Sequence, residues 1–408
     1  MSRPRDSWLA RHLGRRTSSG DFLPVIDGLR FVALWPVVLY HVITHLEGAD
    51  VTNFRASGIS ADVARHGEYG LHVFFMLSGF ILGVPFARAY LRGGTVRLGK
   101  YFLRRLTRVE PPYVLAMVGL WLIYPLAGLA SSAELAPHLG AGLLYSHGMI
   151  YAGLNPVNEV AWSLEVEVQF YLLMPLLGSV FRIVDPGVRR ALLLAGIVAT
   201  TGVAHLVVGE SSWMSLSLLD YLYLFLIGLL LADLFVVGGG RSATSFLGDA
   251  AFASGLVALA LVPVGSPAGT LVSPLGCAAM VAGAMNGRLI RRFLESPPVY
   301  VVGGMCYSVY LCHLAVILLV SPSILAAVQS SSPTLEVLLR TLAFLGAIFI
   351  VSLVFFVLVE RPCMRPDWPK RAVRALGASR RAVDRVRDRL VPLPARQVTV
   401  RETPPIPR

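Results

Sequence analysis

DFLPVIDGLRFVALWPVVLYHVITH, residues 21–45, is the stretch that decides the fold class. It has the length and apolar character of a membrane helix, yet it carries Asp27, Arg30 and His41. Arg30 and His41 are close to a whole number of turns apart, so they share a helix face and are separated by about 16 Å. Ionisable side chains inside a bilayer are costly, so this pair indicates a functional site. The structural alternative is that Arg30 extends to the membrane interface and His41 bridges neighbouring helices.

The composition places the chain among polytopic membrane proteins. Hydrophobic residues make up 55% of the 408 residues, charged residues only 15%, and the mean hydropathy is +0.66. A soluble chain could not bury that much apolar surface. The formal net charge of +12 lies mostly at the ends and in a few loops, so nucleic acid is not an expected partner. The four cysteines show neither a disulfide framework nor metal-ligand spacing, so no metal site is expected.

The hydrophobic segments and the loop charges together predict a topology. From residue 91 onward, basic loops alternate strictly with loops that contain no Arg or Lys. By the positive-inside rule both termini and the basic loops are expected in the cytoplasm. The predicted fold class is an all-α polytopic protein of the cytoplasmic membrane. We predict ten transmembrane helices, at about residues 22–46, 69–90, 112–129, 160–180, 191–208, 215–236, 247–263, 269–285, 299–320 and 335–358.

Three regions are expected along the chain: a basic cytoplasmic arm at 1–20, a membrane domain at 21–362, and a basic tail at 363–408. The tail alternates Arg with apolar residues up to about residue 390, which is typical of an amphipathic helix on an anionic leaflet. Its last part is expected to be disordered. Residues 131–158 are predicted to form a long loop with a partly inserted segment at 139–152. The N-terminus lacks the features of a cleaved signal peptide.

A cationic cluster is predicted at the cytoplasmic mouth of the third span. Arg104, Arg105 and Arg108 are helical neighbours, and arginine binds phosphate oxygens in a bidentate manner. This pattern favours a phosphorylated ligand. Alternatively, these arginines set the topology or contact lipid headgroups.

A second polar layer is expected nearer the outer side, where His41, His72 and His313 fall at depths that overlap with Glu165 and Glu167. The two glutamates are about 200° apart on their helix, so we expect one of them to pair elsewhere. A histidine beside a carboxylate in a sheltered cavity is typical of general base catalysis. A proton relay in a transporter uses the same groups, and the residues alone do not separate these alternatives.

Six short motifs occur in order along the chain. They are IDGLR (26–30) followed by His41, GLHVFFMLSGFIL (70–82), RRLTRVEPPY (104–113), WSLEVEVQFYLLMPLL (162–177), YSVYLCHLAV (307–316) and Glu360-Arg361-Pro362. From Val25 to Pro362 they resemble the motifs of the acyltransferase-3 family of integral membrane O-acyltransferases. The chain departs from the family pattern at Val168, Cys312 and Ala315, and Glu110 is unusual beside the arginine cluster.

The resemblance implies acyl transfer from a cytoplasmic acyl-coenzyme A to a hydroxyl group, usually on a carbohydrate-containing acceptor. By this resemblance acyl-coenzyme A, with acetyl-coenzyme A expected, would be a co-substrate, and no tightly bound cofactor is implied. His41 would remove the hydroxyl proton, and Glu167 would orient or charge-balance the site. The arginine cluster, together with Arg30, would bind the coenzyme phosphates. Further candidate site residues are Asp27, His72, Ser78, Trp162, Tyr171 and His313.

The first helix would then lie along the donor, with Arg30 toward the coenzyme and His41 at the thioester. Pro36 is expected to kink this helix between them, so direct contact between the two side chains is not expected. The acceptor is left open between a cell-envelope glycan, a glycolipid and a glycosylated metabolite such as a macrolide. Membrane lipids are expected partners. A transporter or exporter is the main alternative function, and a sensor or scaffold of the same fold is another.

Overall fold

The computed structural model describes residues 7–15, 22–208, 214–239, 244–263, 266–365 and 368. Within these ranges the chain is helical and forms no strand, with one isolated bridge between Ser245 and Gly287. The α-helices are α1 (Trp8–Leu13), α2 (Pro24–Ala49), α3 (Val51–Ala56), α4 (Ala61–Arg65), α5 (Tyr69–Tyr90), α6 (Leu98–Leu126), α7 (Ser132–Leu143), α8 (His147–Tyr151), α9 (Ala161–Leu177), α10 (Pro186–Val203), α11 (Leu218–Val237), α12 (Phe246–Leu261), α13 (Pro267–Asn286), α14 (Leu289–Leu294), α15 (Pro297–Gly304), α16 (Cys306–Ala327), α17 (Pro333–Phe355) and α18 (Arg361–Cys363). Shorter 3₁₀ or π segments are η1 (His66–Glu68), η2 (Gly178–Arg182), η3 (Ala204–Val208) and η4 (Phe356–Glu360).

Among the described residues, nine helical segments are long and apolar enough to cross a membrane. They confirm the predicted all-α polytopic fold. The remaining predicted span, 247–263, corresponds to α12, which has 16 residues. At 1.5 Å per residue α12 is about 24 Å long, somewhat less than the bilayer's hydrocarbon thickness.

Two predicted loops are shorter in the structure than expected. The basic loop expected between the predicted spans 69–90 and 112–129 ends at Arg97, because Leu, Lys and Arg favour helix and extend α6 backward to Leu98. The predicted loop 131–158 contains α7 and α8. Ser131 and Glu134 form a capping box that starts α7, a sequence signal that the loop prediction overlooked.

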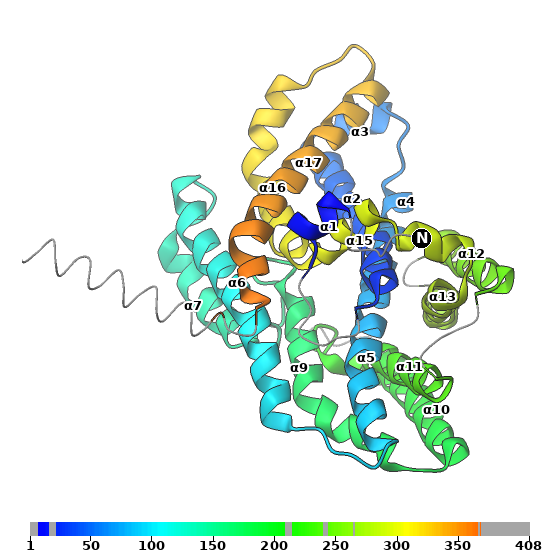
Figure 1. The fold of residues 1–408 in the computed structure, drawn as a ribbon. Coiled ribbons are helices and arrows are strands. Elements are labelled where there is room, and N and C mark those ends of the chain that lie inside the picture. The colour runs from blue at the N-terminus through cyan, green and yellow to red at the C-terminus, as the bar shows by residue number, and fades with distance from the viewer. Residues whose placement is uncertain are drawn as a thin grey trace, which may run out of the picture. The chain divides into compact units, whose positions relative to one another are not determined.

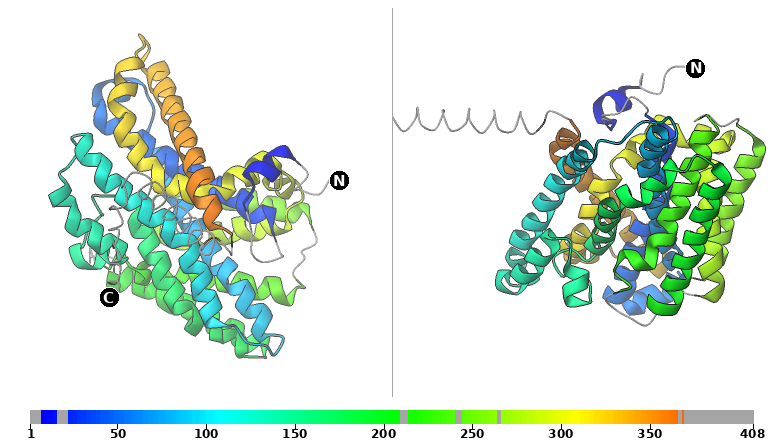
Figure 2. Two further views of the ribbon diagram at one scale, coloured as in Figure 1. Left: turned by 60° about the vertical axis from the view of Figure 1, so that its left-hand side comes forward. Right: turned by 90° about the horizontal axis from the view of Figure 1, so that it is seen from below.

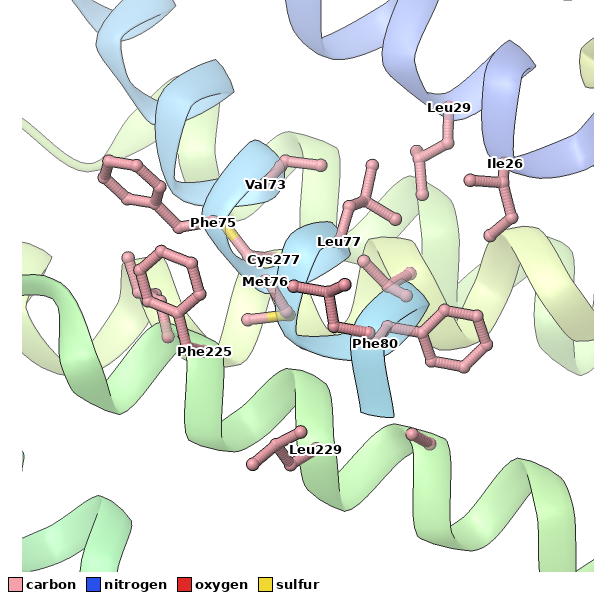
Figure 3. Close-up of a cluster of buried hydrophobic side chains, with 14 of the residues drawn as sticks. Ile26, Leu29, Val73, Phe75, Met76, Leu77, Phe80, Phe225, Leu229 and Cys277 are labelled. Atoms are coloured by element: carbon pink, nitrogen blue, oxygen red, sulfur yellow. The ribbon is translucent and has the colours of Figure 1, made fainter. Parts of the chain in front are cut away.

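Helix α5 lies at the centre of the larger hydrophobic core. It packs most extensively against α11 and also against α2 and α13. Figure 3 shows Phe75, Met76 and Phe80 of α5 facing Phe225 and Leu229 of α11. Two glycines allow this close approach: an added methyl group on Gly79 or Gly228 would collide with the backbone of the facing helix.

Helix α2 connects two cores. Its first half, including Ile26 and Leu29, belongs to the core around α5, whereas Val38 and Val42 in its second half pack with α16 and α17. Figure 1 shows α2 and α5 between the pair α10–α11 and the pair α16–α17, and Figure 2 gives two further views. The α2 helix continues without a break through Pro36.

The described residues up to Met364 belong to one compact unit. Within it, Arg361 donates a hydrogen bond to the carbonyl of Arg11, which ties α1 to the segment after η4. The predicted amphipathic helix of the tail and its predicted disordered end lie outside the described residues.

Candidate functional site

A cavity of about 410 Å³ lies among helices α2, α5, α6, α9, α11 and α16. Its walls contain most of the polar side chains that the sequence singled out, brought together from five helices. The predicted residues that line it are Arg30, His41, His72, Ser78, Arg105, Arg108, Trp162, Glu167, Tyr171 and His313. Two predicted residues, Asp27 and Arg104, do not line it.

One end of the cavity is cationic and is formed by Arg30, Arg105 and Arg108. Arg105 and Arg108 lie one turn apart on α6, and the Arg105 guanidinium lies 5.5 Å from the centre of the Tyr171 ring. Arg108 is close enough to Arg30 and Arg105 to interact with both electrostatically. Arg104 directly precedes Arg105 on α6, but it is exposed and does not line the cavity.

Asp27 holds the start of α2 by ion pairs rather than facing the cavity. Its Oδ1 lies 2.6 Å from Arg30 Nη1 and 2.7 Å from Arg15 Nη1. Burial lowers the pKa of the Arg15 guanidinium, and the Asp27 carboxylate opposes that shift. Arg15 therefore links the N-terminal arm to the cationic end of the site. Helical spacing does not predict this contact, because Arg15 lies outside the first predicted span.

Two histidines face each other farther along the cavity. The rings of His41 and His313 have their centres 5.1 Å apart. His313 Nδ1 lies 3.0 Å from the carbonyl oxygens of both Val309 and Tyr310, and because carbonyls only accept, Nδ1 carries the proton. The other nitrogen, His313 Nε2, is then a hydrogen-bond acceptor, and it is buried without a partner among the described residues.

As the sequence predicts, the side chains of the two glutamates of α9 point to different surroundings. Glu165 is buried, and its carboxylate accepts hydrogen bonds from the backbone N–H groups of His147 and Gly148 at the start of α8. Glu167 lines the cavity and accepts a hydrogen bond of 2.5 Å from Ser78 Oγ. No hydrogen bond joins Glu167 to His41 in the described part of the chain, so any effect of Glu167 on His41 acts through the charge of the site.

The end of the cavity away from the arginines is lined by Tyr40, Glu68, His72, Trp162 and Tyr221. Tyr40, Glu68 and Tyr221 are not among the site residues predicted from the sequence. Glu68 could have been found, because it precedes His72 by four residues and so falls on the same helical face. Tyr221 offered no such signal, since most of α11 is apolar and the contacts of Tyr221 are known only from the fold.

The family model described as "Acyltransferase domain" matches residues 23–360. The chain belongs to the acyltransferase-3 family. Together with the nine apolar helical segments found in the described ranges, this makes the protein a multi-pass integral membrane protein. No solved structure matches the chain significantly.

The curated relatives are distant. The chain is 24% identical over 335 residues to the O-acetyltransferase OatA of Staphylococcus aureus (strain NCTC 8325 / PS 47), an alignment that covers 74% of this chain and 52% of the relative. It is 28% identical over 325 residues to the exopolysaccharide production protein ExoZ of Rhizobium meliloti (strain 1021), covering 76% and 93%. The peptidoglycan O-acetyltransferase OatA of Listeria monocytogenes is 27% identical over 212 residues, covering 48% and 29%. The chain thus spans about half the length of the Staphylococcus relative.

Proposed function

We propose that the protein transfers an acyl group, acetyl in the simplest case, from acyl-coenzyme A to a hydroxyl of a carbohydrate-containing acceptor. The observation that carries this proposal is the distribution of charge in one cavity, with three arginines at one end and a pair of histidines farther along. Family membership and relatives named as O-acetyltransferases support the same reaction class.

The cationic end suits the phosphates of the donor. Arg30, Arg105 and Arg108 line it, and Asp27 neutralises only part of the charge, because it also pairs with Arg15. Arginine forms charge-assisted hydrogen bonds to phosphate oxygens. With the phosphates at this end, the thin arm of the coenzyme lies along α2 toward His41, about 16 Å away.

His41 acts as the general base. It takes the proton of the acceptor hydroxyl while the hydroxyl oxygen attacks the thioester carbon, and the carbon–sulfur bond then breaks as the coenzyme thiolate accepts the proton from His41. His313 Nε2, an acceptor without a partner in the described part of the chain, stabilises the protonated His41 ring after a small rotation of either ring. Glu167 balances the positive charge that develops in the site.

The relatives' names suggest the nature of the acceptor, namely peptidoglycan and an exopolysaccharide. For this chain we propose a cell-envelope glycan or glycolipid, with a glycosylated metabolite as the other option. The proposed location is the cytoplasmic membrane, with both termini and the cationic end of the cavity on the cytoplasmic side.

Mass spectrometry of cells with and without the gene tests this proposal. Glycan, glycolipid and small-metabolite fractions are compared between wild type, a deletion strain, and the deletion strain complemented with His41→Ala. We expect one fraction to lose an acyl mass increment in both the deletion and the His41→Ala strains. Restoration of that increment by His41→Ala would contradict the mechanism, and solute flux in sealed vesicles without acyl donor would indicate a transporter.

A further inference from the structure

The end of the cavity opposite the arginines has an aromatic wall. The rings of Trp162 on α9 and Tyr221 on α11 have their centres 5.5 Å apart, and the Tyr221 and Phe75 centres lie 4.9 Å apart. His72 on α5 lies on the same side, with its ring centre 6.2 Å from Tyr221. Trp162 and Tyr221 are only partly buried, so part of each ring faces the cavity. A sugar ring has apolar C–H faces, which stack on aromatic rings, and its hydroxyl groups need polar partners at the rim.

Glu68 supplies the polar partner, and its carboxylate makes this end of the cavity negatively charged. It lines the cavity, hydrogen-bonds Tyr40 and lies close enough to Tyr221 to interact with it electrostatically. Among the described residues, the cations that line the cavity are Arg30, Arg105 and Arg108, all at the other end. Arg65 lies near Tyr40, but its side chain is 47% exposed, lies 3.7 Å from Glu47 and does not line the cavity.

These groups lie directly beside the proposed catalytic base. The ring centres of Tyr40 and His41 are 4.9 Å apart, and Tyr40 is hydrogen-bonded to Glu68. Tyr40 therefore lies between Glu68 and His41. A ring held by Glu68 and stacked on the aromatic wall would therefore present a hydroxyl to His41. The same carboxylate would repel a carboxylate or phosphate on the acceptor.

We propose that Tyr40, Glu68, Trp162 and Tyr221 form the acceptor subsite, and that this subsite selects an uncharged or amine-bearing sugar ring and excludes an anionic one. This inference rests on the proposed function for its reaction, but it makes a separate statement about binding. Trp162 and Tyr221 stack the ring, and Glu68 accepts hydrogen bonds from its hydroxyl or ammonium group.

Binding of three matched glycosides tests the selectivity directly. Phenyl β-glucoside, phenyl β-glucosaminide and phenyl β-glucuronide present neutral, cationic and anionic versions of one ring. Purified full-length protein in lipid nanodiscs is titrated with each, and the fluorescence change of Trp162 is isolated by subtracting the signal of Trp162→Phe. We expect the glucoside and glucosaminide to bind at least about tenfold more tightly than the glucuronide.

Glu68→Gln is the decisive variant, and Glu47→Gln is its matched control, because Glu47 is a nearby carboxylate outside the cavity. In Glu68→Gln the ratio of the dissociation constants for glucuronide and glucoside should fall by about tenfold, whereas in Glu47→Gln this ratio should stay unchanged. Equal binding of all three glycosides by wild type, or an unaltered preference in Glu68→Gln, would overturn the proposal.

Failure of this inference and failure of the proposed function give different results. If labelled acetyl-coenzyme A yields no acetylated product while glycoside selectivity depends on Glu68, the subsite stands and the reaction is wrong. If acetyl transfer depends on His41 but selectivity does not depend on Glu68, the reaction stands and the subsite is wrong.

Discussion

His313 is the residue whose surroundings most restrict its chemistry. Two backbone carbonyls hold the proton on Nδ1, so Nε2 is available as an acceptor beside His41. In the sequence His313 is only one of several histidines at a similar depth, and the residue at position 312 departs from the family pattern. We propose that His313 is a positioning residue for His41, a role that neither observation from the sequence could establish.

Replacement of His313 should separate turnover from donor binding. His313→Leu removes the acceptor, so we expect kcat to fall by about a hundredfold with little change in KM for acetyl-coenzyme A. His313→Gln keeps an acceptor near the Nε2 position and should retain more activity. Steady-state kinetics with labelled acetyl-coenzyme A measure both constants. Equal kcat values for the Leu and Gln variants would contradict a role for Nε2.

The three arginines of the RRLTR motif should not contribute equally. Arg105 and Arg108 line the cavity, whereas Arg104 is exposed and lies outside it. Because a lost charged hydrogen bond costs about 1.5–3 kcal/mol, Arg105→Gln or Arg108→Gln should raise KM for acetyl-coenzyme A by about tenfold or more. Arg104→Gln should change KM by less than about twofold. A comparable rise for all three variants would show that the donor contacts the whole motif.

At the scale of helices, the contact between α5 and α11 positions one wall of the cavity. His72 and Ser78 lie on α5, and Tyr221 lies on α11. Because Gly79 and Gly228 bring the two backbones together, a small loss of fit at this contact would shift both sets of cavity residues.

Gly79→Ala should destabilise the protein, because its methyl group would meet the backbone of Phe225. We expect a loss of about 1–3 kcal/mol in the free energy of unfolding, the usual cost of overpacking. Gly119→Ala on α6 is the control, since that position has open space around it. Thermal unfolding in one detergent compares the two variants. A melting temperature for Gly79→Ala equal to that of Gly119→Ala would show that the helices can separate at little cost.

At the scale of the whole molecule, charge and hydropathy were sufficient to predict the helical membrane fold, because both act through composition over long segments. The boundaries at α6 and α7 were missed, since helix propensity and capping act over only a few residues. The separation of Glu165 from Glu167 followed from helical periodicity. The contributions of Arg15, Glu68 and Tyr221 depend on contacts between distant segments, which periodicity cannot supply.

The predicted orientation can be tested by labelling single cysteines with a membrane-impermeant maleimide, in a background lacking the four native cysteines. Gly94→Cys lies in a basic loop and Ser331→Cys in a loop without Arg or Lys, and both positions are exposed. We expect Ser331→Cys to be labelled in intact cells, and Gly94→Cys only after the membrane is opened. The opposite pattern would place the cationic end of the cavity outside the cell.

The proposed mechanism depends on His41 acting as the base for acyl transfer within this cavity. The most direct measurement is the rate of acetyl transfer from labelled acetyl-coenzyme A to the acceptor fraction by purified protein in nanodiscs. His41→Ala should lower this rate by at least about a hundredfold while donor affinity stays within about twofold. His45→Ala is the matched control, because His45 lies on the same helix, hydrogen-bonds Ser321 and does not line the cavity. Acetyl transfer by His41→Ala at the wild-type rate would contradict the role of His41 as the general base.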